Sequence, residues 1–259
     1  MNKPYDLILT ESVDGIGFIT LNRPKVLNAI NRQMVSEIVT AAEAFDKDST
    51  IRVIVLSGNG RAFAAGADID EMKDISSIEL ELLNQFVDWD RLAIIKKPII
   101  GAIHGFVLGG GLELALCCDI LFAGEKTEFG FPEVGLGVMP GAGGTQRLTK
   151  LMGKMKALEW LLTGDRMSAH EALQYGVINR VVANELLMEE TVKFARKLAE
   201  RPSLSLRLIK ESVLKAVDSP LNEGMQLERK NFYLLFSSED QKEGMKAFVE
   251  KRKPNFKGK

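Results

Sequence analysis

Two glutamates lie twenty residues apart, each in a stretch that is unusual for a surface acid. Glu113 follows three consecutive glycines in HGFVLGGGLELALCCDI, and Glu133 follows a proline in FGFPEVGLGVMPGAGG. Both stretches are rich in glycine and poor in charge, so we expect each carboxylate to lie near backbone and away from bulk water. Paired, positioned carboxylates are suited to general acid–base catalysis. This pair is the first candidate for a catalytic centre.

The glycines before Glu113 indicate a backbone that a ligand can approach. Gly109, Gly110 and Gly111 lead into 112–116, which is good helix sequence. A helix start rich in glycine leaves N–H groups uncovered and favours negative charge, so it can stabilise an oxyanion. A tight strand-to-helix crossing, where glycine serves only packing, is the alternative.

Small residues also follow an apolar strand at 61–68, RAFAAGAD. They allow close approach at a strand's carboxyl end, where ligands of α/β sheets bind. For the side chains of Asp68 and Asp70 we favour a role as helix-start acids.

The surroundings of Glu133 favour a protonated acid. Pro132 fixes the backbone before it, and the apolar neighbours would disfavour the charged form. A lone glutamate of this kind is otherwise a helix cap or an ion-pair partner. The nearby run PGAGGT at 140–145 lacks the lysine of a P-loop, so it does not indicate a nucleotide site.

Strands alternate with helices through the first two-thirds of the chain, which predicts an α/β fold with a largely parallel sheet. A hairpin with an Asp-Gly turn joins strands 6–11 and 16–21, and further strands are expected at 51–56, 98–103 and 120–123. Helices are expected at 31–45 and 77–95. After Thr145 helical periodicity dominates, at 154–163, 168–175, 186–200, 205–217, 221–235 and 238–251.

Composition narrows the class of protein. The 259 residues include 34 basic and 35 acidic side chains, a balance that argues against a protein built around nucleic-acid phosphates. The adjacent Cys117 and Cys118 fit a reducing cytoplasm rather than a disulfide framework. The two histidines, His104 and His170, have no metal-ligand spacing, so no metal site is expected. No segment has the length of a membrane span, and a cytoplasmic protein is expected.

Six segments together resemble the crotonase superfamily, and most closely its enoyl-CoA hydratases. They are LNRPKVLNAI at 21–30, RAFAAGADI at 61–69, KPIIGAIHGFVLGGGLELALCCDI at 97–120, FGFPEVGLGVMPGAGGTQRL at 129–148, LTGDRMSAHEALQYGVINRVV at 162–182 and EGMKAFVEKRKPNF at 243–256. They occur in the family's order and cover nearly the whole chain.

The resemblance implies the crotonase fold, a superhelical core of repeated ββα units with a helical C-terminal region. It divides the chain into an α/β core at 1–195 and a helical trimerisation region at 196–259, assembled as a homotrimer or a hexamer made of two trimers. A helix near 76–96 is expected to cover the acyl pocket.

The resemblance also implies a reaction and a site. The substrate is an acyl-CoA thioester whose oxygen is held by the N–H groups of Ala67 and Gly110, an oxyanion hole. Because glutamate stands at both hydratase positions, the expected reaction is reversible hydration of a trans-2-enoyl-CoA. Glu113 activates a water and Glu133 delivers the proton, and no cofactor is needed beyond the coenzyme A of the substrate.

Contacts to coenzyme A are implied at Lys25, Val26, Leu27, Ala65, Asp68, Ile69 and Asp70, and at Phe248 and Lys251 of the tail, which reach a neighbouring subunit. Related hydratases often carry lysine at the position of Asp70. Alternative functions are a Δ3,Δ2-enoyl-CoA isomerase, a branched-chain enoyl-CoA hydratase, and a protein that binds RNA or coenzyme A without turnover. Acyl-chain length and pathway stay open, with fatty-acid β-oxidation, amino-acid breakdown and butyrate-type metabolism all compatible.

Overall fold

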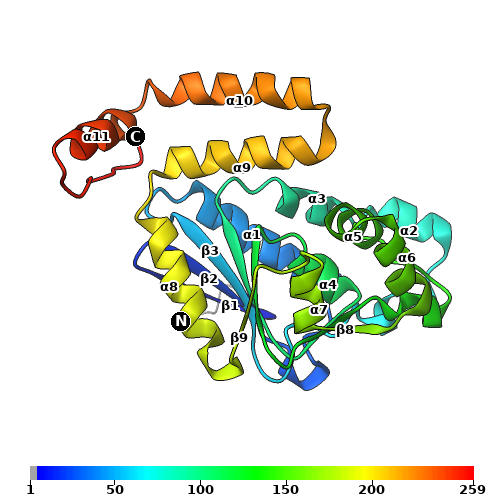
Figure 1. The fold of residues 1–259 in the computed structure, drawn as a ribbon. Helices are drawn as coiled ribbons and strands as arrows, with labels where there is room; N and C mark the ends of the chain where they lie inside the picture. Colours follow the sequence, from blue (N-terminus) through cyan, green and yellow to red (C-terminus); the bar gives the residue numbers. More distant parts are fainter. Residues whose placement is uncertain (1–4) are drawn as a thin grey trace.

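A six-stranded sheet forms the centre of the molecule, with strand order β1-β2-β3-β4-β6-β9 (Figure 1). The computed structural model describes residues 5–259. The first two strands are antiparallel, and every other neighbouring pair in this sheet is parallel. The strands are β1 (Ile8–Val13), β2 (Ile16–Leu21), β3 (Val53–Gly58), β4 (Ile99–Ile103), β6 (Ile120–Gly124) and β9 (Arg180–Val182).

The expected hairpin is confirmed. Asp14 and Gly15 form the two-residue turn between β1 and β2, and both have positive φ, 52° and 78°. This backbone conformation matches the twist of a tight hairpin, which explains the Asp-Gly pair.

Strand β3 is buried on both faces because helices cover both sides of the sheet. Ile54 and Leu56 belong to the large apolar cluster that includes α1 (Arg32–Lys47). Val53 and Val55 point the other way and pack in a second cluster with Ala195 of α8 (Leu187–Ala199). Side chains alternate along a strand, so a strand with two covered faces reads as a continuous apolar run. This explains the sequence VIVL.

A second, three-stranded sheet lies beside the first, in the order β5-β7-β8. Its strands are β5 (Phe106–Leu108), β7 (Glu128–Gly130) and β8 (Arg166–Ser168). None of these, nor β9, was expected from the sequence, because three residues are too few to show the alternation that marks a strand. β5 and β7 lead directly into the two segments that carry Glu113 and Glu133.

Most of the remaining helices lie close to the ranges expected from the sequence, but the helix at Gly144–Met152 was not expected. Helix α1 begins at Arg32 behind an Asn31 cap, and α7 and α11 begin behind Ser168 and Ser238. The other helices are α4 (Gly110–Ala115), α5 (Gly144–Met152), α6 (Lys154–Thr163), α7 (Ala169–Gln174), α9 (Ser203–Asp218), α10 (Leu221–Leu235) and α11 (Glu239–Val249). Short 3-10 helices are η1 (Pro24–Val26), η2 (Ile69–Glu71), η3 (Pro132–Leu136) and η4 (Asn184–Leu186).

The single long helix expected at 77–95 is wrong. The structure has two helices, α2 (Ser77–Leu83) and α3 (Val87–Ala93), separated at Asn84. Asn84 has φ 43°, a left-handed conformation that ends α2 and that asparagine adopts more readily than most residues. The periodic apolar residues continue through this break, which is why the pattern alone suggested one helix.

The C-terminal helices extend beyond the sheet. α9 and α10 pair side by side, and α11 lies past their end (Figure 1). The sheet and α9 are joined by a largely buried ion pair: the ammonium group of Lys210 lies 2.7 Å from Oδ2 of Asp119 and also donates to the Lys97 carbonyl. Asp119 in turn accepts the N–H of Ile99 in β4. Within residues 5–259, no helix is long and apolar enough to cross a membrane.

The Lys210–Asp119 pair predicts a stability difference between two lysines. Lys210→Met leaves the Asp119 carboxylate mostly buried without its cation, and we expect the free energy of unfolding to fall by about 3 kcal/mol. Lys150→Met breaks an exposed ion pair with Asp218, the last residue of α9, and should cost less than about 1 kcal/mol. Urea unfolding of the two variants checks this. Equal losses would show that the buried pair does not tie α9 to the sheet.

Candidate active site

Glu113 is buried in α4 and held by backbone N–H groups. The residue is only 4% exposed. Its Oε1 accepts hydrogen bonds from the N–H of Ala142 at 2.7 Å and from the N–H of Gly144 at 2.8 Å. Gly144 is the first residue of α5. The carboxylate therefore lies at a helix N-terminus, where uncovered N–H groups and the helix dipole favour a negative charge. Both bonds end on Oε1, which leaves Oε2 free of hydrogen bonds from the described part of the chain.

This contact explains the glycine-rich run that resembled a phosphate-binding loop. Segment 140–144 does present N–H groups to an anion, and the anion is the side chain of Glu113. Gly144 has no room for a side chain, because an added Cβ would lie 2.7 Å from the ring of Phe131. The run thus supports a carboxylate of the protein itself.

Burial raises the pKa of Glu113 above its ordinary value. The two backbone hydrogen bonds and the nearby Arg147 guanidinium oppose this by favouring the ionised form. The hydrogen bonds thus hold the Glu113 carboxylate in place as an anion, while burial makes its protonation easier than that of an exposed glutamate.

Glu133 has a different environment. It lies in η3 directly after Pro132, and its Oε2 is buried with no hydrogen-bond partner among residues 5–259. Burial raises its pKa to about 7, and the negative charge of Glu113 adds to the rise. An unpaired buried oxygen is costly, so this atom is suited to a partner that the protein itself does not supply, such as a water or a reacting ligand.

Gly109 lies in contact with both glutamates. Its carbonyl accepts the N–H of Glu113 at 3.0 Å, and a Cβ at this position would lie 2.8 Å from Oε1 of Glu133. Gly109 also has φ 49°. Any larger residue would therefore be strained and would displace Glu133.

The N–H of Ala67 points into the same region. The Gly66 carbonyl accepts the N–H of Ile30 at 2.8 Å, and the N–H of Asp68 donates to the Ile30 carbonyl at 2.8 Å. In a trans peptide the C=O and N–H groups point in opposite directions. Because the Gly66 carbonyl faces Ile30, the Ala67 N–H faces away from it, toward α4.

Gly110 lies opposite Ala67. A Cβ on Gly110 would lie 3.6 Å from the Ala67 nitrogen. Gly110 is the first residue of α4, and neither its N–H nor that of Ala67 has an acceptor among residues 5–259. Two uncovered donors from separate segments can together hold one oxygen and stabilise charge that develops on it.

The structure brings the N-terminal coenzyme A candidates together. Lys25, Val26 and Leu27 lie in and after η1, and the Leu27 carbonyl accepts the N–H of Ala65. This places 25–27 beside 65–70 at the edge of the site. By contrast, Phe248 and Lys251 lie on and just after α11, away from α4 in the same chain (Figure 1). Phe248 is 85% exposed.

Helix-start roles for the two aspartates are only partly confirmed. Asp68 occupies the N-cap position of η2 but makes no capping hydrogen bond, and its carboxylate instead pairs with Arg23. Asp70 lies in the first turn and pairs with Lys73, three residues on. Asp70 is thus an exposed acid bound to a neighbouring lysine.

Sequence reasoning missed Arg23 and Asn28 as structural residues of the site. Asn28 is fully buried, accepts the N–H of Arg23, and donates to the carbonyls of Asn59 and Ala62. Its φ of 55° is another signal, since asparagine tolerates the left-handed region. The motif LNRPKVLNAI contained both residues, but a single sequence does not tell a buried asparagine from a turn residue.

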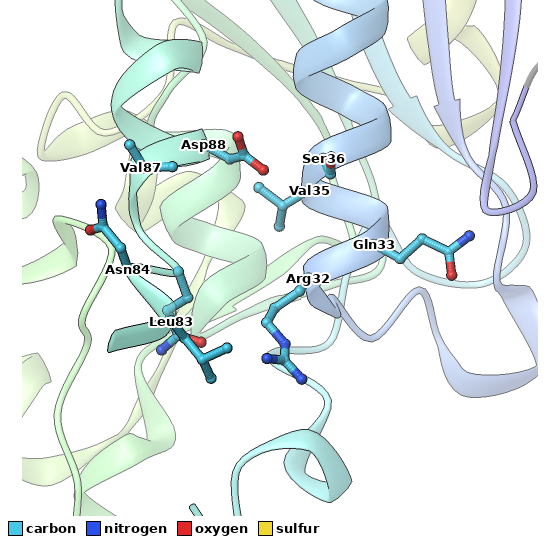
Figure 2. Close-up of a pocket in the computed structure, with 9 residues that line it drawn as sticks. Arg32, Gln33, Val35, Ser36, Leu83, Asn84, Val87 and Asp88 are labelled. Carbon is cyan, nitrogen blue, oxygen red and sulfur yellow. The ribbon is translucent and has the colours of Figure 1, made fainter. Parts of the chain in front are cut away.

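A pocket of about 340 Å³ lies elsewhere, between α1 and the α2–α3 connection (Figure 2). Arg32, Leu83 and Asn84 line it, and neither glutamate does. The side chain of Phe86 contacts the site instead: a Cβ on Gly141 would lie 2.8 Å from its ring. The segment 83–88 therefore separates this pocket from the loop that holds Glu113.

His104 is hydrogen-bonded to the Gly60 carbonyl at 3.0 Å, as expected for a structural histidine. Across residues 5–259, no three His, Cys, Asp or Glu side chains are grouped closely enough to hold a metal ion.

Comparison with known proteins gives consistent matches. A family model described as enoyl-CoA hydratase/isomerase matches residues 11–259. The mitochondrial enoyl-CoA hydratase of Pongo abelii is 48% identical over 242 residues, 93% of this chain and 83% of that protein. A probable enoyl-CoA hydratase of Rhizobium meliloti (strain 1021) is 46% identical over 253 residues, 98% of each chain. A crystal structure of enoyl-CoA hydratase subunit I from Geobacillus kaustophilus HTA426 matches with TM-score 0.97 and 66% identity, covering 98% of this chain and 99% of that one.

The raised pKa of Glu133 predicts a pH-dependent gain in stability for Glu133→Gln. Between its ordinary value of 4.5 and about 7, the folded state retains a proton that the unfolded state has released. The stability that Glu133 contributes is therefore fully present below about 4.5 and lost as pH rises through 7. Glu133→Gln cannot titrate and lacks this loss. From pH 5 to pH 8 its free energy of unfolding should therefore rise relative to that of the wild type by about 1 kcal/mol, allowing for solvent screening.

Urea unfolding at the two pH values measures this gain. Glu125→Gln, which replaces an exposed glutamate between the two site residues in the sequence, serves as the control: its Glu133 is intact, so it should lose stability between the two pH values as the wild type does. A constant difference between Glu133→Gln and wild type would mean that Glu133 is not titrating between these values.

Proposed function

The chain belongs to the enoyl-CoA hydratase/isomerase family, and from this premise we propose how its site carries out hydration. It has the crotonase fold and is an enoyl-CoA hydratase, a hydro-lyase that adds water reversibly across the double bond of a trans-2-enoyl-CoA. The proposal concerns the residues that perform this reaction, and it is carried by one observation: the buried carboxylate of Glu113 and the partly buried carboxylate of Glu133, both with raised pKa values, lie beside two uncovered N–H groups.

The N–H groups of Ala67 and Gly110 bind the thioester oxygen. Attack of water at the β-carbon moves the electrons of the double bond toward the thioester and leaves enolate-like negative charge on this oxygen. The two donors have no partner in the described chain, so they are available for that charge without breaking another bond. Gly110 at the start of α4 adds the positive end of a short helix.

Glu113 and Glu133 hold the reacting water between them. Glu113 is anchored through Oε1, so its Oε2 accepts a proton from the water as the water's oxygen attacks the β-carbon. Glu133, with pKa about 7, donates its proton to the α-carbon. The product is a 3-hydroxyacyl-CoA, and transfer of one proton between the carboxyl groups restores the starting state. The pair titrates as a coupled unit.

Each step uses a group that the chain or the substrate supplies, so the mechanism calls for no cofactor beyond coenzyme A. The coenzyme A binds along 25–27 and 65–70, where the two segments meet. The acyl chain extends toward the loop at 140–144 and the α2–α3 connection, near Phe86.

We further propose that the site is completed by another subunit of a trimer or a hexamer. The α/β core at 1–195 carries both glutamates, while the region at 196–259 exposes large apolar side chains such as Val213 and Tyr233, 60% and 66% exposed. Such surfaces fit contacts between subunits. Phe248 and Lys251, far from the site in their own chain, would then contact coenzyme A bound to a neighbour. The free cysteines fit a cytoplasmic location.

Replacement of either glutamate by glutamine tests the reaction. Glutamine keeps the shape of the side chain but neither accepts nor delivers the proton, so we expect kcat for crotonyl-CoA to fall by about 10²–10⁴-fold. Loss of the enone-thioester ultraviolet absorbance reports hydration directly. Glu125→Gln should remain as active as wild type. Full activity of Glu113→Gln would rule out the proposed role of this residue.

The shared site is tested with mixed subunits. Lys251→Ala should raise KM for crotonyl-CoA about tenfold with kcat nearly unchanged, because a phosphate contact contributes about equally to ground and transition states. In hybrids of Lys251→Ala and Glu113→Gln subunits, the first supplies intact glutamates and the second an intact tail. Some sites combine the two, so part of the activity should regain the wild-type KM. Hybrids with the KM of Lys251→Ala alone would show that the tail does not serve a neighbour.

A further inference from the structure

The Arg23 guanidinium contacts both backbone segments that meet at Ala67. Nη1 donates to the Ala29 carbonyl at 2.6 Å, and Nη1 and Nη2 donate to Oδ2 of Asp68 at 3.0 and 3.1 Å. Ala29 directly precedes Ile30, and Asp68 directly follows Ala67. One side chain thus bridges the two residues that flank the Ile30–Ala67 pairing.

This pairing decides where the Ala67 N–H points. The Gly66–Ala67 peptide is planar, and its carbonyl is held by the Ile30 N–H at 2.8 Å. Any shift of Ile30 relative to Asp68 would rotate this peptide and turn the N–H away from Gly110. Gly66 itself resists rotation little, since it has no side chain and has φ 119°. The orientation must therefore be enforced from outside the peptide.

Arg23 is itself well anchored. Its backbone N–H donates to Oδ1 of the buried Asn28 at 2.8 Å, and Asn28 is bonded to the 59–62 segment. The Arg23 and Asp68 side chains are only 21% and 22% exposed, so their ion pair is less screened by water than a surface pair.

From this geometry we propose that Arg23 is a positioning residue that aims the Ala67 N–H at the substrate oxygen, acting through Ala29 and Asp68. The inference rests on the proposed oxyanion role of Ala67. It also reassigns Asp68, which was expected to bind coenzyme A: its carboxylate is occupied by Arg23. A misplacement of about 1 Å in a catalytic group costs up to about 10²-fold in rate, so the loss of Arg23 should be felt mainly in the transition state.

Two ligands separate this role from a purely structural one. Butyryl-CoA presents a neutral thioester, whereas the enolate of acetoacetyl-CoA presents an oxygen with negative charge, as the transition state does. We expect Arg23→Ala to bind butyryl-CoA within about threefold of wild type, to lose about tenfold or more in affinity for the enolate, and to lose about 10- to 100-fold in kcat. Arg23→Lys keeps the charge without the two-pronged donor and should fall in between.

Asp68→Asn should behave like Arg23→Ala, and the double variant should be no worse than the poorer single one, because both changes break the same bridge. Glu71→Gln is the matched control. Glu71 lies in η2, the short helix that Asp68 precedes, and pairs with Arg32 at the start of α1. Breaking this neighbouring ion pair should leave the preference for the enolate and the kcat unchanged. Thermal unfolding of all variants identifies any that fail to fold, in which case Arg23→Lys and Asp68→Asn decide the question.

Three results would overturn the inference. Equal weakening of both ligands would indicate that Arg23 contacts coenzyme A or maintains the fold in general. Unchanged enolate affinity would show that Ala67 is aimed without Arg23. Additive effects of Arg23→Ala and Asp68→Asn would show that they act separately. A wild-type protein that hydrates crotonyl-CoA yet binds the two ligands equally would instead refute the oxyanion role of Ala67 itself.

Discussion

The hydrogen bonds from Ala142 and Gly144 to Glu113 are the interaction on which the site depends. A carboxylate that is 4% exposed would ordinarily give up its charge or move to solvent. Here the start of α5 supplies two N–H donors to one oxygen. This arrangement keeps Glu113 inside while leaving its second oxygen for chemistry. It also requires close contacts around Gly141 and Gly144, and Phe86 and Phe131 fill the space that the missing side chains leave.

Most of the backbone just before Ala67 is paired with neighbouring segments. Phe63, Ala64 and Ala65 each donate to a neighbouring segment, and Gly66 accepts from Ile30. Buried backbone groups are nearly always paired. Ala67 lies between two residues that are both bonded to Ile30, Gly66 through its carbonyl and Asp68 through its N–H, so its open N–H belongs to a fixed segment rather than to a loose loop. Parallel strands β3 and β4 bring this segment and α4 to the same edge of the sheet.

Much of this could be predicted from the sequence, and the limits have physical causes. Glu113, Glu133, Ala67 and Gly110 were expected together only through the family resemblance, because the contacts between their segments are made by backbone atoms that every residue carries. The Asn84 break and the three-residue strands β5, β7 and β8 escaped notice, since local conformation there depends on tertiary contacts. Asp68 was expected to bind coenzyme A because the family resemblance covers 65–70, and a single sequence does not show that its partner is Arg23, 45 residues earlier.

The unlike environments of the two glutamates suit them to hydration in both directions. Glu113 has two N–H donors on its carboxylate, whereas Oε2 of Glu133 has no partner within residues 5–259 and the pKa of this residue is raised to about 7. In the proposed mechanism the pair carries one proton in each state, on Glu133 before hydration and on Glu113 after water has attacked the β-carbon. Two identical environments would leave the proton without a preferred site, and neither carboxyl group would be consistently acid or base. In the proposed mechanism, the difference between a carboxylate bound at a helix start and one whose Oε2 is buried without a partner thus decides which group acts as base and which as acid.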